Sequence, residues 1–97
     1  MEKIFYLNSL YDLYKELFTE KQQMYFEAYY FENLSLAEIA ENNDVSRNAI
    51  HNQIKIMEDK LEELESKLHL LKKKETIIKK LENKIDKELL EEIKELI

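Results

Sequence analysis

The sequence of 97 residues contains no glycine, no proline and no cysteine. At average usage, a chain of this length carries on the order of twelve glycines and prolines. Without glycine, the phosphate-binding loops of P-loop and dinucleotide-binding proteins are excluded, and the Asn-Gly and Asp-Gly turns of β-hairpins are missing. Without cysteine, disulfides and thiolate metal sites are excluded. The composition, 37% charged and 44% hydrophobic, therefore predicts an all-α protein.

Long apolar runs and an excess of positive charge are also missing. No stretch of about 18 apolar residues exists and the amino-terminal residues lack a signal-peptide pattern, so we expect a cytoplasmic protein with no membrane partner. The net charge is −6, which repels nucleic acid and anionic membranes from the molecule as a whole. A nucleic-acid interface would have to be a local face, and Arg47 is the only arginine available to it.

Helix signals follow one another along the first half of the chain. Apolar residues at three- and four-residue steps predict an amphipathic helix over 2–18. Capping boxes at Thr19 and at Ser35 predict two further helices, one to about residue 31 with Met24 on its apolar side, and one to about residue 42.

A polar turn at 43–45 then separates the short third helix from a long one that Ser46 caps, which is the spacing of a helix-turn-helix motif. We expect Asp44 in a left-handed conformation, because Asn and Asp tolerate it best after glycine. Burial of Ile50 and Ile54 would turn one polar face outward. Its residues are Ser46, Arg47, Asn48, His51, Asn52 and Lys55.

This polar face suits double-stranded DNA. Arginine pairs with guanine, asparagine with adenine and lysine with guanine or phosphate, while a helix start accepts a backbone phosphate. A helical pair with a solvated polar face also occurs as plain scaffold, and Glu38, Glu41 and Asp44 flank the face with negative charge. The sequence pattern alone does not distinguish a DNA-binding face from a solvated face of a helical scaffold.

The second half of the chain carries a heptad-like stripe. The fourth helix has no stop signal before the lysines at 72–74, and a last amphipathic stretch covers about 76–97. We expect a helix-turn-helix domain over 1–57 and a helical extension over 58–97. The extension makes a homodimer through Leu61, Leu64, Leu68 and Leu71, or its last helix folds back on that stripe within one chain.

No catalytic, metal or cofactor site is indicated. His51 and His69 lie 18 residues apart on one predicted helix, about 27 Å, so they cannot share a metal. No nucleophile stands beside a base, and we predict that the protein is not an enzyme. The ten aromatics lie between Phe5 and Phe31. Those at 25–31 cannot all face one core. Either they form a tyrosine-rich core whose hydroxyls reach the surface, or some of them form a partner-binding patch.

The chain resembles region 4 of bacterial sigma factors and, more closely, the YlxM family of small bacterial helix-turn-helix proteins. The resemblance covers about residues 10–71. It is carried by Leu10-Tyr11-Asp12-Leu13-Tyr14, Leu17-Phe18-Thr19-Glu20-Lys21-Gln22, Leu34-Ser35-Leu36-Ala37-Glu38-Ile39-Ala40-Glu41, Val45-Ser46-Arg47 and Glu65-Ser66-Lys67-Leu68. It implies a sigma region 4-like bundle with a long C-terminal helix and helical tail, DNA binding, and a link to the signal recognition particle pathway.

The sequence thus predicts a DNA-binding regulator, with components of the signal recognition particle as further partners. The alternative is a protein-interaction adaptor that keeps this fold and binds little DNA. Two positions favour the alternative, because the family usually has glutamine where this chain has Asn48 and arginine where it has Ile56.

Overall fold

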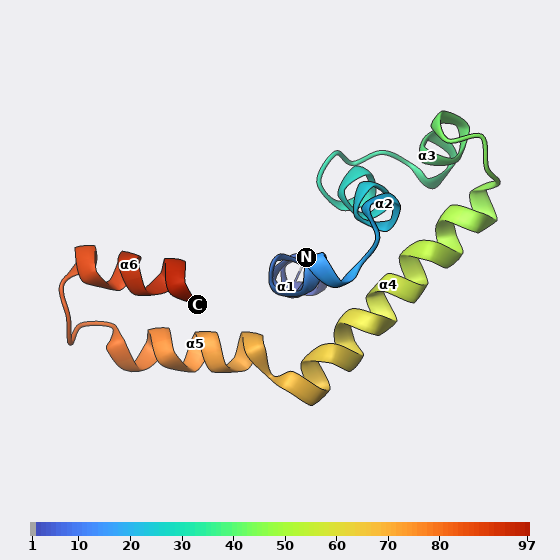
Figure 1. The fold of residues 1–97 in the computed structure, drawn as a ribbon. Helices are drawn as coiled ribbons and strands as arrows, with labels where there is room; N and C mark the ends of the chain where they lie inside the picture. The colour runs from blue at the N-terminus through green and yellow to red at the C-terminus, as the bar shows by residue number, and fades with distance from the viewer. Residues whose placement is uncertain (1) are drawn as a thin grey trace.

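The computed structural model describes residues 2–97, and that range is helical with no strand, which confirms the all-α prediction. Residue 1, the first of the predicted domain, lies outside the described residues. In chain order the elements are α1 (Glu2–Tyr14), a 3-10 turn η1 (Lys15–Leu17), α2 (Glu20–Tyr30), α3 (Leu36–Asn42), α4 (Arg47–Leu68), α5 (Leu70–Leu81) and α6 (Lys87–Leu96). Figure 1 shows α1, α2 and α3 along one side of α4, and α5 and α6 as a hairpin beyond them.

Local capping begins α2 where the sequence predicts it. The Thr19 hydroxyl accepts a hydrogen bond from the Gln22 backbone N–H at 3.1 Å, and the Gln22 amide oxygen accepts one from the Thr19 N–H at 3.1 Å. These bonds satisfy two backbone donors that a helix start leaves free. Met24, predicted on the apolar side of α2, is instead 46% exposed, because the helix turns Tyr25, Phe26 and Ala28 inward.

Two clusters of buried side chains hold the helices together. One joins α1, α2, the middle of α4 and the start of α5, and contains Leu7, Leu10, Tyr11, Tyr14, Phe18, Phe26, Met57, Leu61 and Leu71. The other lies under α3 and contains Tyr25, Ala28, Ile39, Ala40, Ile50 and Ile54. The small Ala40 at this crossing lets α3 approach α4 closely.

Tyrosines fill much of this core, and their hydroxyls make hydrogen bonds at its edge. Tyr11 stacks on Phe26 with ring centroids 4.2 Å apart. The hydroxyls of Tyr11 and Tyr30 donate to the carboxylates of Glu27 and Glu58. Burial and then these carboxylates raise the pKa of both tyrosines. The aromatics of the second helix do divide between core and surface, as the sequence predicts, since Phe26 is fully buried and Phe31 is 47% exposed.

The long helix ends earlier than its heptad pattern predicts. It was expected to continue to the lysines at 72–74, which is wrong, because His69 adopts a left-handed conformation with φ 55° and begins a new helix. The buried carboxylate of Glu65 stabilises this joint. It accepts hydrogen bonds from the Tyr14 hydroxyl at 2.8 Å and from the backbone N–H groups of Leu71 and Lys72 at 3.0 and 3.1 Å. It thereby caps α5 from the preceding helix.

The predicted dimerisation stripe is divided by this joint. Leu61 and Leu71 are buried in the cluster with Leu7 and Leu10, and Leu64 packs against it, whereas Leu68 is 46% exposed. Helix α1 of the same chain therefore covers most of the stripe. The proposed domain boundary after residue 57 falls inside α4, and homodimerisation stays a prediction.

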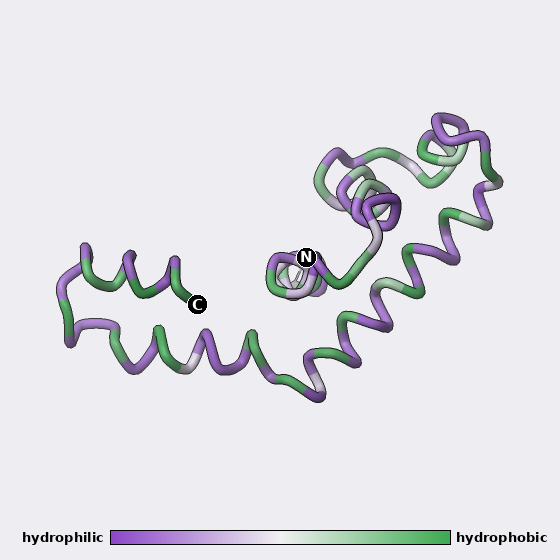
Figure 2. Tube along the Cα trace, in the orientation of Figure 1, coloured by the Kyte–Doolittle hydropathy of each residue, from purple (hydrophilic) through white to green (hydrophobic). Residues whose placement is uncertain are grey.

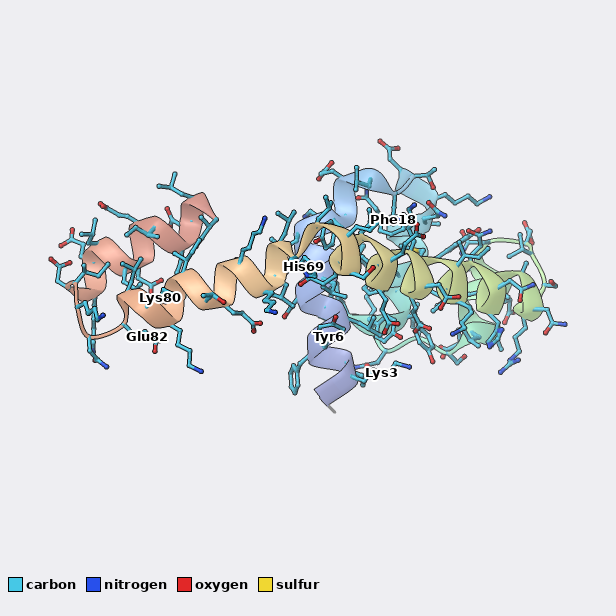
Figure 3. The ribbon with its side chains drawn as sticks, turned by 90° about the horizontal axis from the view of Figure 1, so that it is seen from below. Lys3, Tyr6, Phe18, His69, Lys80 and Glu82 are labelled. Carbon is cyan, nitrogen blue, oxygen red and sulfur yellow. The ribbon has the colours of Figure 1, made fainter. Side chains whose placement is uncertain are left out.

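The carboxy-terminal stretch is two helices rather than the single stretch expected over 76–97. Helix α5 ends at Leu81, Asn83 turns with φ 63°, and the Asp86 carboxylate accepts a hydrogen bond from the Leu89 N–H at 2.7 Å to begin α6. In Figure 3, α1 crosses the chain near the corner marked by His69, and the hairpin bearing Lys80 and Glu82 extends away from it. Within this hairpin, α6 packs against α5.

Candidate nucleic-acid interface

Helix α3 is short and is fixed at both ends. The Ser35 hydroxyl accepts from the Glu38 N–H and the Glu38 carboxylate accepts from the Ser35 N–H, both at 3.0 Å. These bonds to Ser35 lower the pKa of Glu38. At the other end, the Asn43 side-chain amide donates to the Ile39 carbonyl at 2.7 Å. The orientation of α3 is therefore set by local bonds as well as by packing.

The turn between α3 and α4 has the predicted left-handed residue. Asp44 has φ 54°, and the following Val45 N–H donates to the Ala40 carbonyl at 3.1 Å, which closes the turn over the end of α3. Ser46 then caps α4 with its hydroxyl accepting from the Ala49 N–H at 3.0 Å. The predicted helix-turn-helix geometry is confirmed, with α4 as the second helix.

The first turns of α4 carry a polar face that is exposed to solvent. Ile50 and Ile54 are buried against α2 and α3, so the opposite side of α4 faces solvent. The exposed set is Ser46, Arg47, Asn48, His51, Asn52 and Lys55, as the sequence predicts. The structure brings all six to one helix start, and whether they bind nucleic acid stays a prediction.

The lysine of this face is engaged by its own helix. The Lys55 Nζ lies 3.2 Å from a carboxylate oxygen of Asp59, one turn further along α4. This hydrogen bond and the charge of Asp59 raise the pKa of Lys55. Both side chains are more than 60% exposed, so the pair is weak and Lys55 can exchange Asp59 for a phosphate.

An apolar groove lies beside the polar face, and sequence reasoning missed it. It runs between the start of α2 and α4, with a volume of about 630 Å³, and is lined by Tyr25, Val45, Ile50, Asn52 and Ile56 among others. Ile56 is 53% exposed at its edge. The available signal was Ile56 itself, an apolar residue on the side of α4 where the pattern calls for a polar one.

Charge around the interface is mixed. Glu41 and Asp44 are exposed on α3 and in the turn, within a few residues of Arg47 along the chain. Within residues 2–97, no three His, Cys, Asp or Glu side chains come together in a group that could hold a metal ion. The face is thus a polar surface with little net positive charge.

Comparison with known proteins agrees with this geometry. The model of the UPF0122 family, described as "Putative helix-turn-helix protein, YlxM / p13 like", matches residues 1–97. The chain belongs to this family. Among its relatives are proteins named UPF0122 from Bacillus thuringiensis, Bacillus mycoides and Bacillus anthracis, each 49% identical over 63 residues. The match covers 65% of this chain and 57% of the length of those relatives.

Family membership confirms the resemblance to the YlxM family and the helix-turn-helix class. Helices long and apolar enough to cross a bilayer do not occur within residues 2–97.

Proposed function

We propose that this chain is a cytoplasmic DNA-binding regulator that inserts the start of α4 into the major groove. One observation carries the proposal, namely the exposed row of Arg47, Asn48, His51 and Asn52 on the second helix of a helix-turn-helix. An α-helix fits the major groove, and the amino-terminal residues of such a recognition helix reach the base edges.

Each side chain has a role that follows from its chemistry. Arg47 donates two hydrogen bonds to a guanine, and Asn48 or Asn52 pairs with an adenine. Lys55 leaves Asp59 to contact a phosphate, and the Ser46 end of α4 meets another with its free backbone N–H groups. The interface offers few cations, so binding neutralises only two or three phosphates and the affinity falls gently with salt.

The test is a titration of fluorescent duplex DNA, taken from upstream of the gene's own operon, at low and moderate salt. The variant Arg47→Ala/Lys55→Ala removes two charges from the polar face. The control Lys60→Ala/Lys67→Ala removes two exposed charges from the same helix outside it. We expect the first pair to weaken binding about a hundredfold and the second about threefold or less. No binding by the natural chain at low salt would reject DNA recognition.

A second candidate function is favoured by the apolar groove and the exposed Ile56 beside the same face. A protein helix that fills this groove would make the chain an adaptor on the helix-turn-helix fold. The family resemblance suggests the setting, since it links such chains to the signal recognition particle, whose components we propose as partners.

The adaptor function can be tested by titrating the purified GTPase of the signal recognition particle against the natural chain and against the Ile56→Lys variant. Loss of binding in this variant, with DNA affinity unchanged, supports it. Equal binding of the GTPase by both proteins would exclude the groove.

A further inference from the structure

The α5–α6 hairpin has more apolar surface than it buries. Within Leu70–Leu81, Leu71 alone is buried, and it packs on the α1 cluster rather than on α6. Within Lys87–Leu96, no side chain is buried. Yet both helices are strongly amphipathic, as the alternating hydrophobic and hydrophilic segments along them in Figure 2 show. Two helices of this length cannot hide such faces on each other alone.

The exposed apolar residues lie along one edge of each helix. On α5 they are Leu70 and Ile77, which are 41% and 40% exposed, and on α6 they are Leu89 and Leu96, at 42% and 83%. Both pairs are spaced by seven residues, so each forms a straight seam at the repeat of a coiled coil. The inner edges, such as Ile78 and Ile93, are half-buried. Because the helices run antiparallel (Figure 1), their outer edges open on the same side of the hairpin.

The polar faces of the two helices have opposite charge. Helix α5 carries five lysines and one glutamate, whereas α6 carries two lysines and four glutamates. Lys73 and Lys80 lie three residues beyond Leu70 and Ile77, beside the apolar edge of α5, and both are exposed. A surface built from one basic and one acidic helix is complementary to itself after a two-fold rotation, because α5 of one copy then lies beside α6 of the other.

We propose that a second copy of this chain covers the apolar side of the hairpin, so that two hairpins form an antiparallel four-helix bundle. Leu70, Ile77, Leu89 and Leu96 form its core, and the α5 lysines flank the α6 glutamates of the partner. Four short helices with apolar seams are the smallest arrangement in which all such faces are buried. The closed two-fold contact also stops at two copies, since each hairpin uses its whole apolar side once.

The proposed dimer does not rest on DNA binding, because the hairpin lies at the far end of α4 from the polar face. It leaves the α1–α5 contacts intact, since Leu61 and Leu71 stay in the core of their own chain. It also places two recognition helices in one symmetric particle, which fits a palindromic target.

The test is sedimentation equilibrium of the full chain, with Ile77→Glu/Leu89→Glu as the interface variant. The matched control is Leu17→Glu/Met24→Glu, which adds the same charge at apolar residues that are 65% and 46% exposed outside the hairpin. We expect a dimer at tens of micromolar for the natural chain and the control. The interface variant should dissociate about a hundredfold more readily, because each buried charge without a partner is strongly unfavourable.

A second variant keeps the proposal testable where the first unfolds the hairpin. Lys79→Glu/Lys80→Glu changes exposed residues alone, and should weaken the dimer about tenfold at low salt and less at high salt. A natural chain that stays monomeric overturns the proposal and leaves the apolar side to another partner. A dimer equally strong in both variants and the control would also overturn it, because the contact would then lie elsewhere.

Discussion

The helices α1 to α4 and the hairpin α5–α6 both carry apolar side chains on one side, yet they differ in what those side chains meet. In the first region the faces converge, and Leu10, Phe26, Ile50 and Leu61 are fully buried. In the hairpin, by contrast, Leu70, Ile77 and Leu89 are exposed, although α6 is as amphipathic as α4. Amphipathic pattern therefore predicts that a face needs a partner, and only the arrangement of helices shows whether the chain supplies it.

The same comparison holds for polar bonds. Carboxylates in the first region accept hydrogen bonds across large sequence distances, as in Glu65 with Tyr14, 51 residues apart. In the hairpin, the bonds of Asp86 and Glu91 reach only three residues. The first region is thus specified by tertiary contacts and the second by local ones.

Deleting the same apolar atoms in the two regions should give the largest contrast. Leu61→Ala leaves a cavity in the core and should lower the free energy of unfolding by about 2–5 kcal/mol. Leu89→Ala should change that of the monomer by less than about 0.5 kcal/mol. Urea denaturation at low protein concentration measures both, and equal losses would show that the hairpin has a core of its own.

The joint between the regions should be the next most sensitive. Glu65→Gln removes a buried carboxylate that three donors share, and should cost about 1–3 kcal/mol of unfolding free energy. The control Glu63→Gln changes an exposed carboxylate 3.0 Å from Lys67 and should cost well under 1 kcal/mol. Thermal denaturation at neutral pH compares them, and equal losses would contradict a role for Glu65 as the cap of α5.

The joint should also respond to acid. Burial favours the neutral acid, but the N–H groups of Leu71 and Lys72 and the Tyr14 hydroxyl hold the pKa of Glu65 below its ordinary value of 4.5. A group whose pKa is lower when folded stabilises the fold above the unfolded value and loses this as the pH falls through the folded value. Stability should therefore decline below about pH 4.5, and less steeply in Glu65→Gln. Parallel pH profiles of the two proteins would contradict this.

The cap of α4 should have a smaller effect. Ser46→Ala removes the acceptor of the Ala49 N–H and should cost about 1 kcal/mol. Ser66 offers a control on the same helix, since its hydroxyl only bonds back to the Glu63 carbonyl, so Ser66→Ala should be nearly neutral. Chemical denaturation of both variants distinguishes the positions.

The smallest effects are expected at two residues in the left-handed conformation, Asp44 in the turn before α4 and His69 in the joint after it. Asp44→Gly and His69→Gly remove a side chain from a conformation that glycine adopts freely, so each should be neutral or stabilising by less than about 1 kcal/mol. Calorimetric melting temperatures measure the change. Marked destabilisation at position 44 would mean that its carboxylate stabilises the turn in another way.

Local signals account for what the sequence could predict. The capping boxes at Thr19 and Ser35, the cap at Ser46 and the left-handed turn at Asp44 all depend on residues a few positions apart, and the structure has each of them. The exposed row on α4 followed from the burial of Ile50 and Ile54.

Distant contacts account for what it could not predict. His69 interrupts a continuous heptad stripe because Glu65 caps the new helix start while it accepts a hydrogen bond from Tyr14. No residue near position 69 indicates that Tyr14, 51 residues from Glu65, reaches this joint. The groove beside Ile56 likewise needs α2 and α4 to be placed first. The Asn83 turn is an exception, because Asp86 is a local cap signal for a separate last helix, whereas the sequence pattern predicts one stretch over 76–97.

The uninterrupted length of α4 has a mechanical consequence. Its 22 residues form a rod of about 33 Å from the turn of the helix-turn-helix to the joint at His69. A continuous helix is stiff, so in the proposed dimer the separation of the two proposed DNA-binding faces would be fixed by helix length and not by a flexible linker. The spacing between sites on a target would then be encoded in how many turns α4 makes.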